Sequence, residues 1–546
     1  MSNKWSLLWL TTLLLPIYVI VTRYKAPEIT QSNFLQGYDN TGDEVNTDLF
    51  YQNKGLVEYA ADPQVINYNG TYYMYATNAN KNYDCSYLQC WSSKNLTDWT
   101  NEGICYQPKV TESSWCIDGL WAPEVIERNG MFYMYYSGFK IHPENEYDPD
   151  YPIWWRGHQI GVATSYSPTG PFIDVPSPTS DPTEAPIQVI IPGDGVRCAV
   201  IDASPFIDDN GDAYLLVTKD QYHYENEPGQ PYRSSVLIAR LQDNMTSVVE
   251  NGIEGKTWKE LVKPDHKYEN VSGSLSSWNE APFMYKRNGL YYLLYSANFY
   301  KDREYCICVA TSTSPVGPFV KYDKPLLSAL DEWDYVSGTG HCSLFDSPDG
   351  NELFMAYHVH QDPSMAGDER KIYFDRVVFE GEKMVVRGPS ISPQPLPSGT
   401  NGYGNIAKEA IITVNGNVVD RLNDDQYAIF EDNATGYEQS TGATDVVLKV
   451  TFETERSINA VMLYDSIKPN LAVNKINRLE INGLVVDDIE MKPEYHEDGR
   501  IPMSAIIYEF NEMKTKEITM YLRRDDGNRQ IISLNEVVVM GKVNEK

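Results

Sequence analysis

The feature that most constrains the fold is a hairpin pattern that recurs along the first two thirds of the chain. Each copy has a short apolar segment, an Asn-Gly or Asp-Gly dipeptide and a second, aromatic segment. The copies are DPQVINYNGTYYMYAT (62–77), APEVIERNGMFYMYYS (122–137), ASPFIDDNGDAYLLVT (203–218), APFMYKRNGLYYLLYS (281–296) and the degenerate GHCSLFDSPDGNELFMAYH (340–358). Asn-Gly between two such segments predicts a tight β-hairpin, because both turn positions need a positive φ.

A second shared element lies between the hairpins. Its best copies are ATSYSPTGPF (163–172) and ATSTSPVGPF (310–319), with looser versions at 90–100, 238–248 and 372–381. Each unit therefore supplies four strands. Five such units predict an all-β fold, a five-bladed β-propeller over residues 51–397. The alternative is a set of unrelated hairpins in a large sandwich, which five matching turns disfavour.

The composition changes near residue 398, where a Pro/Gly/Ser-rich stretch predicts a linker at residues 398–405. The block that follows, residues 406–546, is again rich in short apolar strands but lacks the blade pattern. Its alternation and its length predict a β-sandwich domain.

The N-terminal end is apolar and carries no charge between Lys4 and Arg23. This pattern predicts a signal peptide or a signal anchor at residues 1–26, with a polar lead-in at residues 27–50. We therefore expect a secreted protein, or one attached to a membrane through this uncleaved segment alone. A buried core helix at the N-terminus is the alternative.

The net charge narrows the class of partner. The chain carries a formal charge of −31 at pH 7, so it repels nucleic acid, anionic lipid and polyanionic substrates. Neutral, hydroxyl-rich carbohydrates remain as the expected partner. The eight cysteines are too few for a disulfide scaffold. Cys85 with Cys90 and Cys105 with Cys116 are candidate local pairs, and free buried thiols are the alternative.

Three of the five units carry a carboxylate where the first strand begins. Asp62, Asp202 and Glu280 hold this place, whereas the second unit has Trp121 and the fifth has His341. In a propeller the first strands line the central channel, so we expect these side chains to meet in one pocket. Paired carboxylates are what glycoside hydrolysis requires, one to protonate the leaving oxygen and one to activate water. A third carboxylate can raise the pKa of the acid, and Trp121 offers a flat face for a sugar ring.

Each of these residues has a plainer interpretation. An Asp before Pro is commonly a turn residue, and Asp202 alone would be read as a cap or a loop acid. Asp208 and Asp209 are predicted to be turn acids, and Glu124 is predicted to be structural. His341 is either a hydrogen-bonded core histidine or a ligand for a metal or water at the channel mouth.

The blade sequences resemble those of glycoside hydrolase family 43, inverting enzymes built on five-bladed propellers. The segments that carry the resemblance are ADPQV, GLWAPEV, IDASPFIDDNGDAYL, EAPFMYKRNGLYYLLYS and GTGHCSLF. It implies that Asp62 is the general base, Asp202 the pKa modulator and Glu280 the general acid. It also implies a structural calcium or other cation at His341, and no cofactor for catalysis. Arg370 matches a family arginine that contacts the substrate sugar.

The end segments of the C-terminal block, RLNDDQYAIFED (421–432) and SLNEVVVMGK (533–542), resemble those of a discoidin-like, galactose-binding-type sandwich. The resemblance implies a carbohydrate-binding module. A purely structural companion domain is the alternative.

We therefore expect an inverting glycosidase that acts on polysaccharide or oligosaccharide side chains. An α-L-arabinofuranosidase or a β-xylosidase is favoured; galactofuranosidase, endo-arabinanase and galactanase activities stay open. A lectin-like, non-catalytic propeller and a retaining hydrolase of the sucrose or fructan type are the alternatives. The long loops at 140–158 and 219–233 are expected to shape the pocket, with Trp154 and Trp155 either stacking on substrate or plugging the loop.

Overall fold

The structure is a computed structural model, and it describes part of the chain. The described residues are 48–53, 55–79, 84–111, 114–116, 118–139, 158–177, 184–187, 189, 199–220, 232–271, 276–329, 336–365, 367–424, 437–440, 446–465, 475–481, 483–490, 495–496, 499–500, 505–523 and 531–543. The predicted signal segment, most of the lead-in, Trp154, Trp155 and Cys198 lie outside them.

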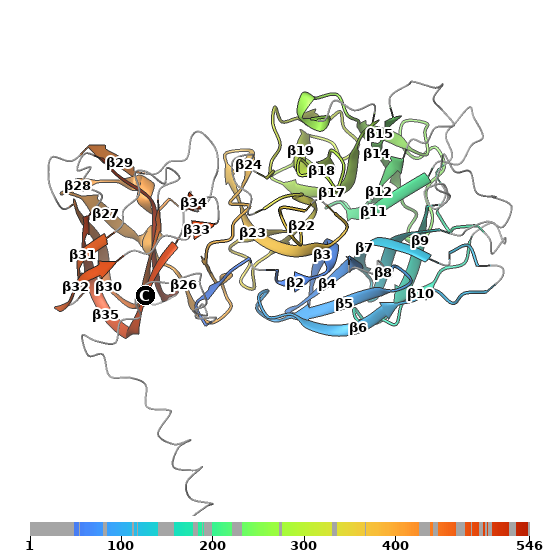
Figure 1. Ribbon diagram of the computed structural model, residues 1–546. Helices are drawn as coiled ribbons and strands as arrows, with labels where there is room; N and C mark the ends of the chain where they lie inside the picture. The colour runs from blue at the N-terminus through green and yellow to red at the C-terminus, as the bar shows by residue number, and fades with distance from the viewer. Residues whose placement is uncertain are drawn as a thin grey trace, which may run out of the picture.

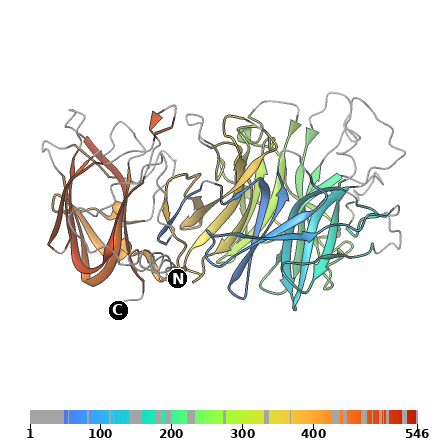
Figure 2. The ribbon, with the colours of Figure 1, turned by 60° about the horizontal axis from the view of Figure 1, so that its bottom comes forward.

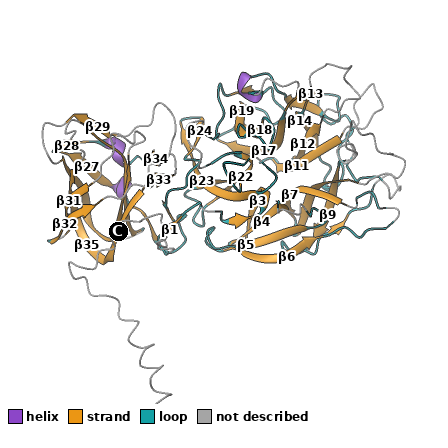
Figure 3. Ribbon diagram, in the orientation of Figure 1, coloured by secondary structure: helices purple, strands orange, loops and turns teal. Residues whose placement is uncertain are grey.

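Strands make up nearly all of the regular structure (Figure 3). In the described residues the helical elements are three-residue 3-10 turns, η3 (Lys267–Glu269), η4 (Ala407–Glu409) and η5 (Asp420–Leu422). No helix of the described chain is both long enough and apolar enough to span a membrane.

The first domain is a five-bladed β-propeller, as predicted (Figure 1). Blade 1 comprises β3 (Ala60–Tyr68), β4 (Thr71–Asn78), β5 (Leu88–Ser93) and β6 (Thr100–Tyr106). Blade 2 comprises β7 (Asp118–Arg128), β8 (Met131–Phe139), β9 (Gln159–Ser165) and β10 (Ile173–Asp174). Blade 3 comprises β11 (Ala199–Ile207), β12 (Ala213–Asp220), β14 (Ser235–Arg240) and β15 (Lys259–Val262).

The last two blades complete the ring. Blade 4 comprises β17 (Asn279–Arg287), β18 (Leu290–Ala297), β19 (Cys306–Ser312) and β20 (Val320–Lys321). Blade 5 comprises β21 (Gly340–Asp346), β22 (Leu353–His360) and β23 (Arg370–Glu380), with β2 (Val57–Glu58) and β24 (Lys383–Val386) both paired to β23. Since β2 precedes blade 1 in sequence, its pairing with blade 5 closes the propeller. A short parallel pair, β13 (Tyr232–Arg233) with β16 (Ser276–Ser277), joins the segments before β14 and β17.

The hairpin turns follow the sequence prediction in blades 1, 2 and 4, and they are wider in blades 3 and 5. In blade 5, β21 ends at Asp346 and β22 begins at Leu353. Asn69 and Gly70 both have positive φ, at 53° and 72°, as a two-residue turn of the predicted kind requires. The Asn-Gly of blade 3 lies in a wider turn, since β11 ends at Ile207 and β12 begins at Ala213. Asp208, in this wider turn, is bound by Lys286 of the next blade, with 2.5 Å between Nζ and Oδ1.

The apolar core of the propeller is divided among the blade interfaces. Five clusters of buried side chains each draw on two neighbouring blades. Between blades 1 and 5, for example, Met74 packs with Phe354 and Phe374. Each blade therefore buries both faces against its neighbours, so the packing of one blade depends on the side chains of the next.

The C-terminal domain is a β-sandwich, as predicted. Its strands are β26 (Tyr403–Asn405), β27 (Ala410–Val414), β28 (Asn417–Val418), β29 (Tyr437–Ser440), β30 (Val446–Asp465), β31 (Lys475–Ile481), β32 (Leu484–Glu490), β35 (Ala505–Arg523) and β36 (Ile531–Lys542), with a separate hairpin of β33 (Tyr495–His496) and β34 (Gly499–Arg500). The two longest strands, β30 and β35, take part in both layers, and their pairing register shifts between Thr451 and Arg456.

The two domains lie side by side (Figure 2), and they share a buried apolar contact. Val461 and Leu463 of β30 point into the sandwich core, whereas Met462 and Tyr464 pack with Leu49 and Phe50. Phe50 belongs to β1 (Phe50–Tyr51), which pairs with β25 (Gln394–Pro395) at the end of the propeller. The continuous apolar run of β30 is thus explained by burial of both faces, a pattern that a half-exposed sheet would not show.

We predict that Phe50→Ala lowers the melting temperature of the whole protein. Phe50 is fully buried between the domains, and truncating such a side chain costs about 3–5 kcal/mol. Ile104→Ala is the control, because Ile104 is 53% exposed and surface changes stay within about 0.5 kcal/mol. Equal thermal shifts in the two variants would contradict this account of the interface.

Candidate active site

Every blade has a β-bulge at the same place in its first strand. In blade 1, Ala61 pairs with Thr77 and Gln64 pairs with Tyr75, so two residues of β3 oppose one residue of β4. The other four first strands show the same shift of register. The first bulge residue has positive φ in every blade: Asp62 (54°), Ala122 (46°), Asp202 (56°), Ala281 (54°) and His341 (47°). Such strained positions cluster at functional sites.

The five bulges are joined by a ring of hydrogen bonds that runs from blade to blade. In each case the backbone N–H of a bulge residue donates to a side chain on the second strand of the preceding blade. The pairs are Ala122 to Thr77 Oγ1 (2.7 Å), Asp202 to Ser137 Oγ (3.0 Å), Ala281 to Thr218 Oγ1 (3.1 Å), His341 to Ser296 Oγ (2.8 Å) and Asp62 to His358 Nδ1 (3.2 Å). We call this set the bulge ring.

The bulges refine the predicted equivalence of the three acids. Asp62, Asp202 and His341 occupy the first bulge position, but Glu280 and Trp121 lie one residue earlier, next to Ala281 and Ala122. The prediction that all three acids hold equivalent positions is therefore wrong by one residue for Glu280. Alternation of side chains is interrupted at a bulge, so both positions can present a side chain to the same side.

All six predicted site residues line one cavity of about 500 Å³. They are Asp62, Trp121, Asp202, Glu280, His341 and Arg370. The aromatic residues Phe139, Trp278, Phe299, Tyr300 and Tyr305 also line it. A cavity with aromatic walls and a few convergent charged groups is typical of a small-molecule site.

Asp62 is surrounded by cations and donors. Its Oδ1 lies 3.1 Å from Arg370 Nη1 and 3.3 Å from His341 Nδ1, and its Oδ2 accepts a hydrogen bond of 2.6 Å from Thr77 Oγ1. Burial alone would raise the pKa of Asp62, but Arg370 and His341 lower it well below its usual value. The group is therefore an anion at neutral pH.

His358 is a neutral histidine that contacts the backbone of Asp62. Burial lowers the pKa of His358 to about 3, so Nδ1 is able to accept the Asp62 N–H in the bulge ring. The His358 ring also stacks on Tyr305, with 5.7 Å between ring centroids.

Tyr305 connects His358 to Glu280. Its hydroxyl donates a 2.8 Å hydrogen bond to Glu280 Oε1. The ring fits because Gly340 lies against it, and a Cβ built on Gly340 would meet the Tyr305 ring at 1.8 Å. Sequence reasoning missed Tyr305, although the Gly before His341 in GTGHC is the trace of the space that it needs.

Asp202 accepts a hydrogen bond from the strand that carries Glu280. Its Oδ2 accepts the N–H of Ala281 at 3.0 Å and the hydroxyl of Thr218 at 3.2 Å. Burial, opposed by His341 and reinforced by Asp62, raises the pKa of Asp202. The predicted modulator thus contacts the residue that directly follows Glu280.

Two further contacts set the walls of the cavity. The Trp121 ring stacks on His158 at 4.0 Å between centroids, and burial lowers the pKa of His158 to about 3, so the stack is uncharged. On the other side Arg370 lies over the Tyr300 ring, and Tyr300 donates to Asp368 at 2.7 Å. Trp121 is therefore held as a flat wall, and Arg370 is fixed between Tyr300 and Asp62.

The cavity also contains a thiol that sequence reasoning did not place there. Cys85 lines the cavity, and burial raises the pKa of its thiol to about 12. It is therefore a neutral wall and not a nucleophile. None of the seven described cysteines forms a disulfide, and all are buried, which agrees with the alternative of free thiols.

The calcium ion predicted at His341 stays a prediction, and the charge around this histidine does not favour it. Calcium takes six to eight oxygen ligands, and a metal-bound histidine must be neutral. Burial would lower the pKa of His341, but Asp62, Asp202 and Glu124 raise it to about 9, so the ring is a cation. In the described part of the chain, one group of three acidic, histidine or cysteine residues has all its ligand atoms within 4.8 Å of one another. It lies elsewhere, at Asp265, His266 and Glu269.

Glu124, predicted to be structural, is buried next to the site but does not line the cavity. Burial raises its pKa to about 8.

Comparison with known proteins agrees with the fold and the site. The sequence pattern of the family described as "Glycosyl hydrolases family 43" matches residues 51–384. The chain is similar to a β-D-galactofuranosidase of Aspergillus niger, with 27% identity over 58% of this chain and 79% of that protein. It is also similar to xylosidase/arabinosidase 43A of Humicola insolens, with 26% identity over 50% of this chain and 82% of that protein.

Among solved structures, the chain is similar to a thermostable family-43 glycoside hydrolase. The two sequences are 33% identical, and the TM-score is 0.53. The match covers 64% of this chain and 99% of the other. The family pattern, at residues 51–384, falls within the propeller and ends before the C-terminal sandwich.

We predict that Gly340→Ala disturbs the site. The added methyl group would overlap the Tyr305 ring, and such overpacking costs about 1–3 kcal/mol. We expect a lower melting temperature, and a crystal structure of the variant should show the Tyr305 ring displaced from Glu280. Gly367→Ala is the control, because a Cβ there meets nothing within 4 Å. If the Tyr305 ring kept its position in the Gly340→Ala variant, this account of the packing would be contradicted.

Proposed function

The chain belongs to glycosyl hydrolase family 43 and is a glycoside hydrolase, and from this premise we propose that it hydrolyses glycosidic bonds of neutral oligosaccharide or polysaccharide side chains with inversion. The observation that carries the proposal is the cavity itself. Carboxylates from three different blades, Asp62, Asp202 and Glu280, line it together with Arg370 and a stacked tryptophan. A binding protein would have no use for this set of acids, and no observation favours the lectin-like alternative.

Glu280 is the proposed general acid. It donates a proton to the glycosidic oxygen as the bond to the anomeric carbon breaks. The Tyr305 hydroxyl donates a hydrogen bond to one carboxyl oxygen, Oε1, and so orients the carboxyl group in the cavity. Asp202 keeps the acid in place, because it binds the N–H of the next residue, Ala281.

Asp62 is the proposed general base. Arg370 and His341 take up Oδ1, and Thr77 takes one of the lone pairs of Oδ2. A carboxylate has about four lone-pair sites, so Oδ2 retains one for a water molecule. That water attacks the anomeric carbon from the face opposite to the leaving group. An inverting pair of carboxyl groups stands about 6.5–9.5 Å apart to admit this water.

Arg370 has two proposed roles. Its guanidinium balances the charge of Asp62, and it lies over Tyr300 at the edge of the cavity, where it can donate to a sugar hydroxyl. Trp121 would stack on the apolar face of the sugar ring. Both roles suit a neutral pentose or a furanose ring and supply no site for a polyanion.

We favour α-L-arabinofuranosidase or β-xylosidase activity. The Humicola insolens relative is named as a xylosidase/arabinosidase, which supports this choice. The Aspergillus niger relative is named as a β-D-galactofuranosidase, and this makes galactofuranosidase the second candidate. Endo-arabinanase and galactanase activities are further family options.

The remaining proposals concern segments beyond the catalytic cavity. We propose export through residues 1–26, followed by secretion or by attachment to a membrane through that segment. We propose carbohydrate binding for the sandwich domain at residues 406–546. A structural calcium ion in the channel stays a prediction that the ligands around His341 do not favour.

We predict that the protein releases sugar from 4-nitrophenyl α-L-arabinofuranoside or 4-nitrophenyl β-D-xyloside, with the β-D-galactofuranoside as the third substrate of the panel. Glu280→Gln and Asp62→Asn should each lower kcat/KM by about 10²–10⁴-fold, the usual contribution of general acid–base catalysis. Asp209→Asn is the control, because this turn acid has 84% of its side chain exposed. Near-normal rates in either cavity variant would overturn its proposed role.

A further inference from the structure

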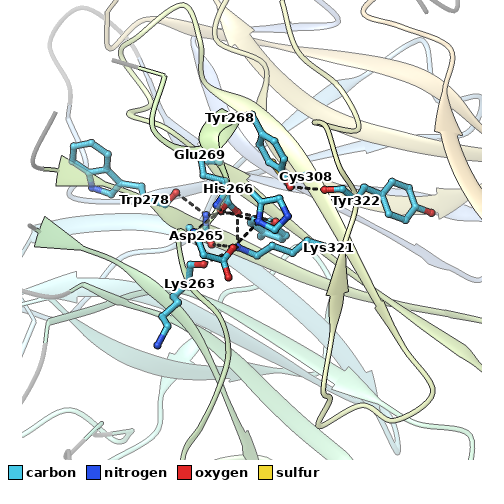
Figure 4. Close-up of polar contacts among 12 residues, drawn as sticks. Lys263, Asp265, His266, Tyr268, Glu269, Trp278, Cys308, Lys321 and Tyr322 are labelled. Atoms are coloured by element: carbon cyan, nitrogen blue, oxygen red, sulfur yellow. Dashed lines mark hydrogen bonds and ion pairs between the residues drawn. The ribbon is translucent and has the colours of Figure 1, made fainter. Parts of the chain in front are cut away.

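A network of charged and polar side chains surrounds Glu269 and Lys321 (Figure 4). It contacts the first residue of β17, Asn279. Its centre is the Lys321 ammonium group, which comes from β20 at the outer edge of blade 4. The contacts of Lys321 Nζ are with Glu269 Oε1 (2.6 Å), the Lys263 carbonyl oxygen (2.6 Å), Asp265 Oδ1 (2.8 Å) and Asn279 Oδ1 (3.2 Å). The group at Asp265, His266 and Glu269 that has metal-binding spacing is therefore filled by a lysine cation.

Glu269 is fully buried and has hydrogen-bond partners on both carboxylate oxygens. Oε2 accepts the backbone N–H groups of Asp265 and His266, both at 2.8 Å. Oε1 accepts from Tyr295 Oη at 3.0 Å and from Asn279 Nδ2 at 3.1 Å, besides Lys321. A buried ion pair with so many partners has little freedom to shift.

Asn279 joins this network to the active site. Its side chain contacts both members of the ion pair, through Nδ2 to Glu269 and through Oδ1 from Lys321. Its backbone is also fixed, because the N–H donates to Ser234 Oγ at 3.0 Å and the carbonyl oxygen accepts from the same hydroxyl at 3.1 Å. Asn279 is fully buried.

The residues on either side of Asn279 face the cavity. Trp278 and Glu280 both line it, whereas Asn279 points the other way, as alternation along a strand requires. The proposed acid and an aromatic wall are thus attached to one backbone segment, and Asn279 ties that segment down.

We propose that Lys321, Glu269 and Asn279 are positioning residues for Glu280, which set where the acid stands although none of them lines the cavity. This inference rests on the proposed role of Glu280 as general acid. The two hydrogen bonds of the Asn279 side chain fix both its position and its orientation, because hydrogen bonds are directional. An apolar contact would not fix the orientation. A displacement of a catalytic group by 1 Å can cost about 10²-fold in rate, so a network outside the cavity can control the acid step.

The test uses the full-length protein and two substrates with the same sugar. The phenyl glycoside has a poor leaving group that needs protonation, and the 2,4-dinitrophenyl glycoside has a good one that does not. In Lys321→Met, Glu269→Gln and the double variant, we expect kcat/KM for the phenyl glycoside to fall about 10- to 100-fold. For the dinitrophenyl glycoside we expect a change below about threefold, because only the acid step is impaired. The double variant leaves no uncompensated buried charge, which protects its folding.

Lys286→Met is the matched control. Lys286 lies on the same strand, β17, and its ion pair with Asp208 is also largely buried, but it stands at the hairpin end of the strand and does not line the cavity. Equal losses on both substrates, or losses no greater than in Lys286→Met, would overturn the positioning role. Glu280→Gln measured alongside separates the two claims. If it shows no leaving-group dependence, the proposed acid itself fails; if it does and the Lys321 and Glu269 variants do not, only the positioning role fails.

Discussion

The architecture of the site depends on the bulge ring, the five hydrogen bonds that run from the bulge of each blade to the second strand of the blade before it. A backbone N–H at a bulge has lost its partner in the sheet ladder, and a buried N–H without a partner is costly. A Thr, Ser or His side chain on the neighbouring blade supplies that partner. The same contacts fix the blades relative to one another, and therefore fix the distance between residues that stand on different blades.

The positive φ of the bulge positions favours the residue types found at three of them. Asp and His tolerate positive φ better than β-branched residues do, and three of the five bulge positions hold Asp62, Asp202 or His341. In Asp62 and Asp202 the side chain is tied as well, to Thr77 and Thr218. Asp62 and Asp202 thus take part both in the contacts between blades and in the proposed chemistry, and Glu280 directly precedes the ring residue Ala281.

Charged groups support the proposed catalytic residues both inside the cavity and behind its wall, in a chain with a net charge of −31. Asp62 is ionised because Arg370 and His341 balance it. Asp202 has a raised pKa and directs its hydrogen bonds to the strand of Glu280. The Lys321–Glu269 pair holds that same strand from the opposite side. Each of the two functional carboxylates therefore has a dedicated support, built from groups distant in sequence.

The repeat in the sequence was enough to predict the five blades, since Asn-Gly turns and aromatic strands are local signals. It also predicted that Asp62, Asp202 and Glu280 share one cavity. It did not predict the one-residue offset of Glu280, because a bulge changes register without changing composition. The roles of Tyr305 and Lys321 were not predicted for another reason. They depend on contacts with residues in other strands and loops, and the sequence around them carries no motif. The predicted calcium ion at His341 stays a prediction, and the neighbouring carboxylates that raise the pKa of this histidine do not favour it.

The central claim is that a base and an acid on separate blades are held far enough apart for a water molecule to attack between them. The stereochemistry of the first-formed sugar tests it most directly. Proton NMR during the early hydrolysis of an aryl glycoside that the protein cleaves should show the anomer opposite to that of the substrate before mutarotation. Release of the same anomer would mean a covalent glycosyl-enzyme intermediate, which requires the two carboxylates to stand closer than this account allows.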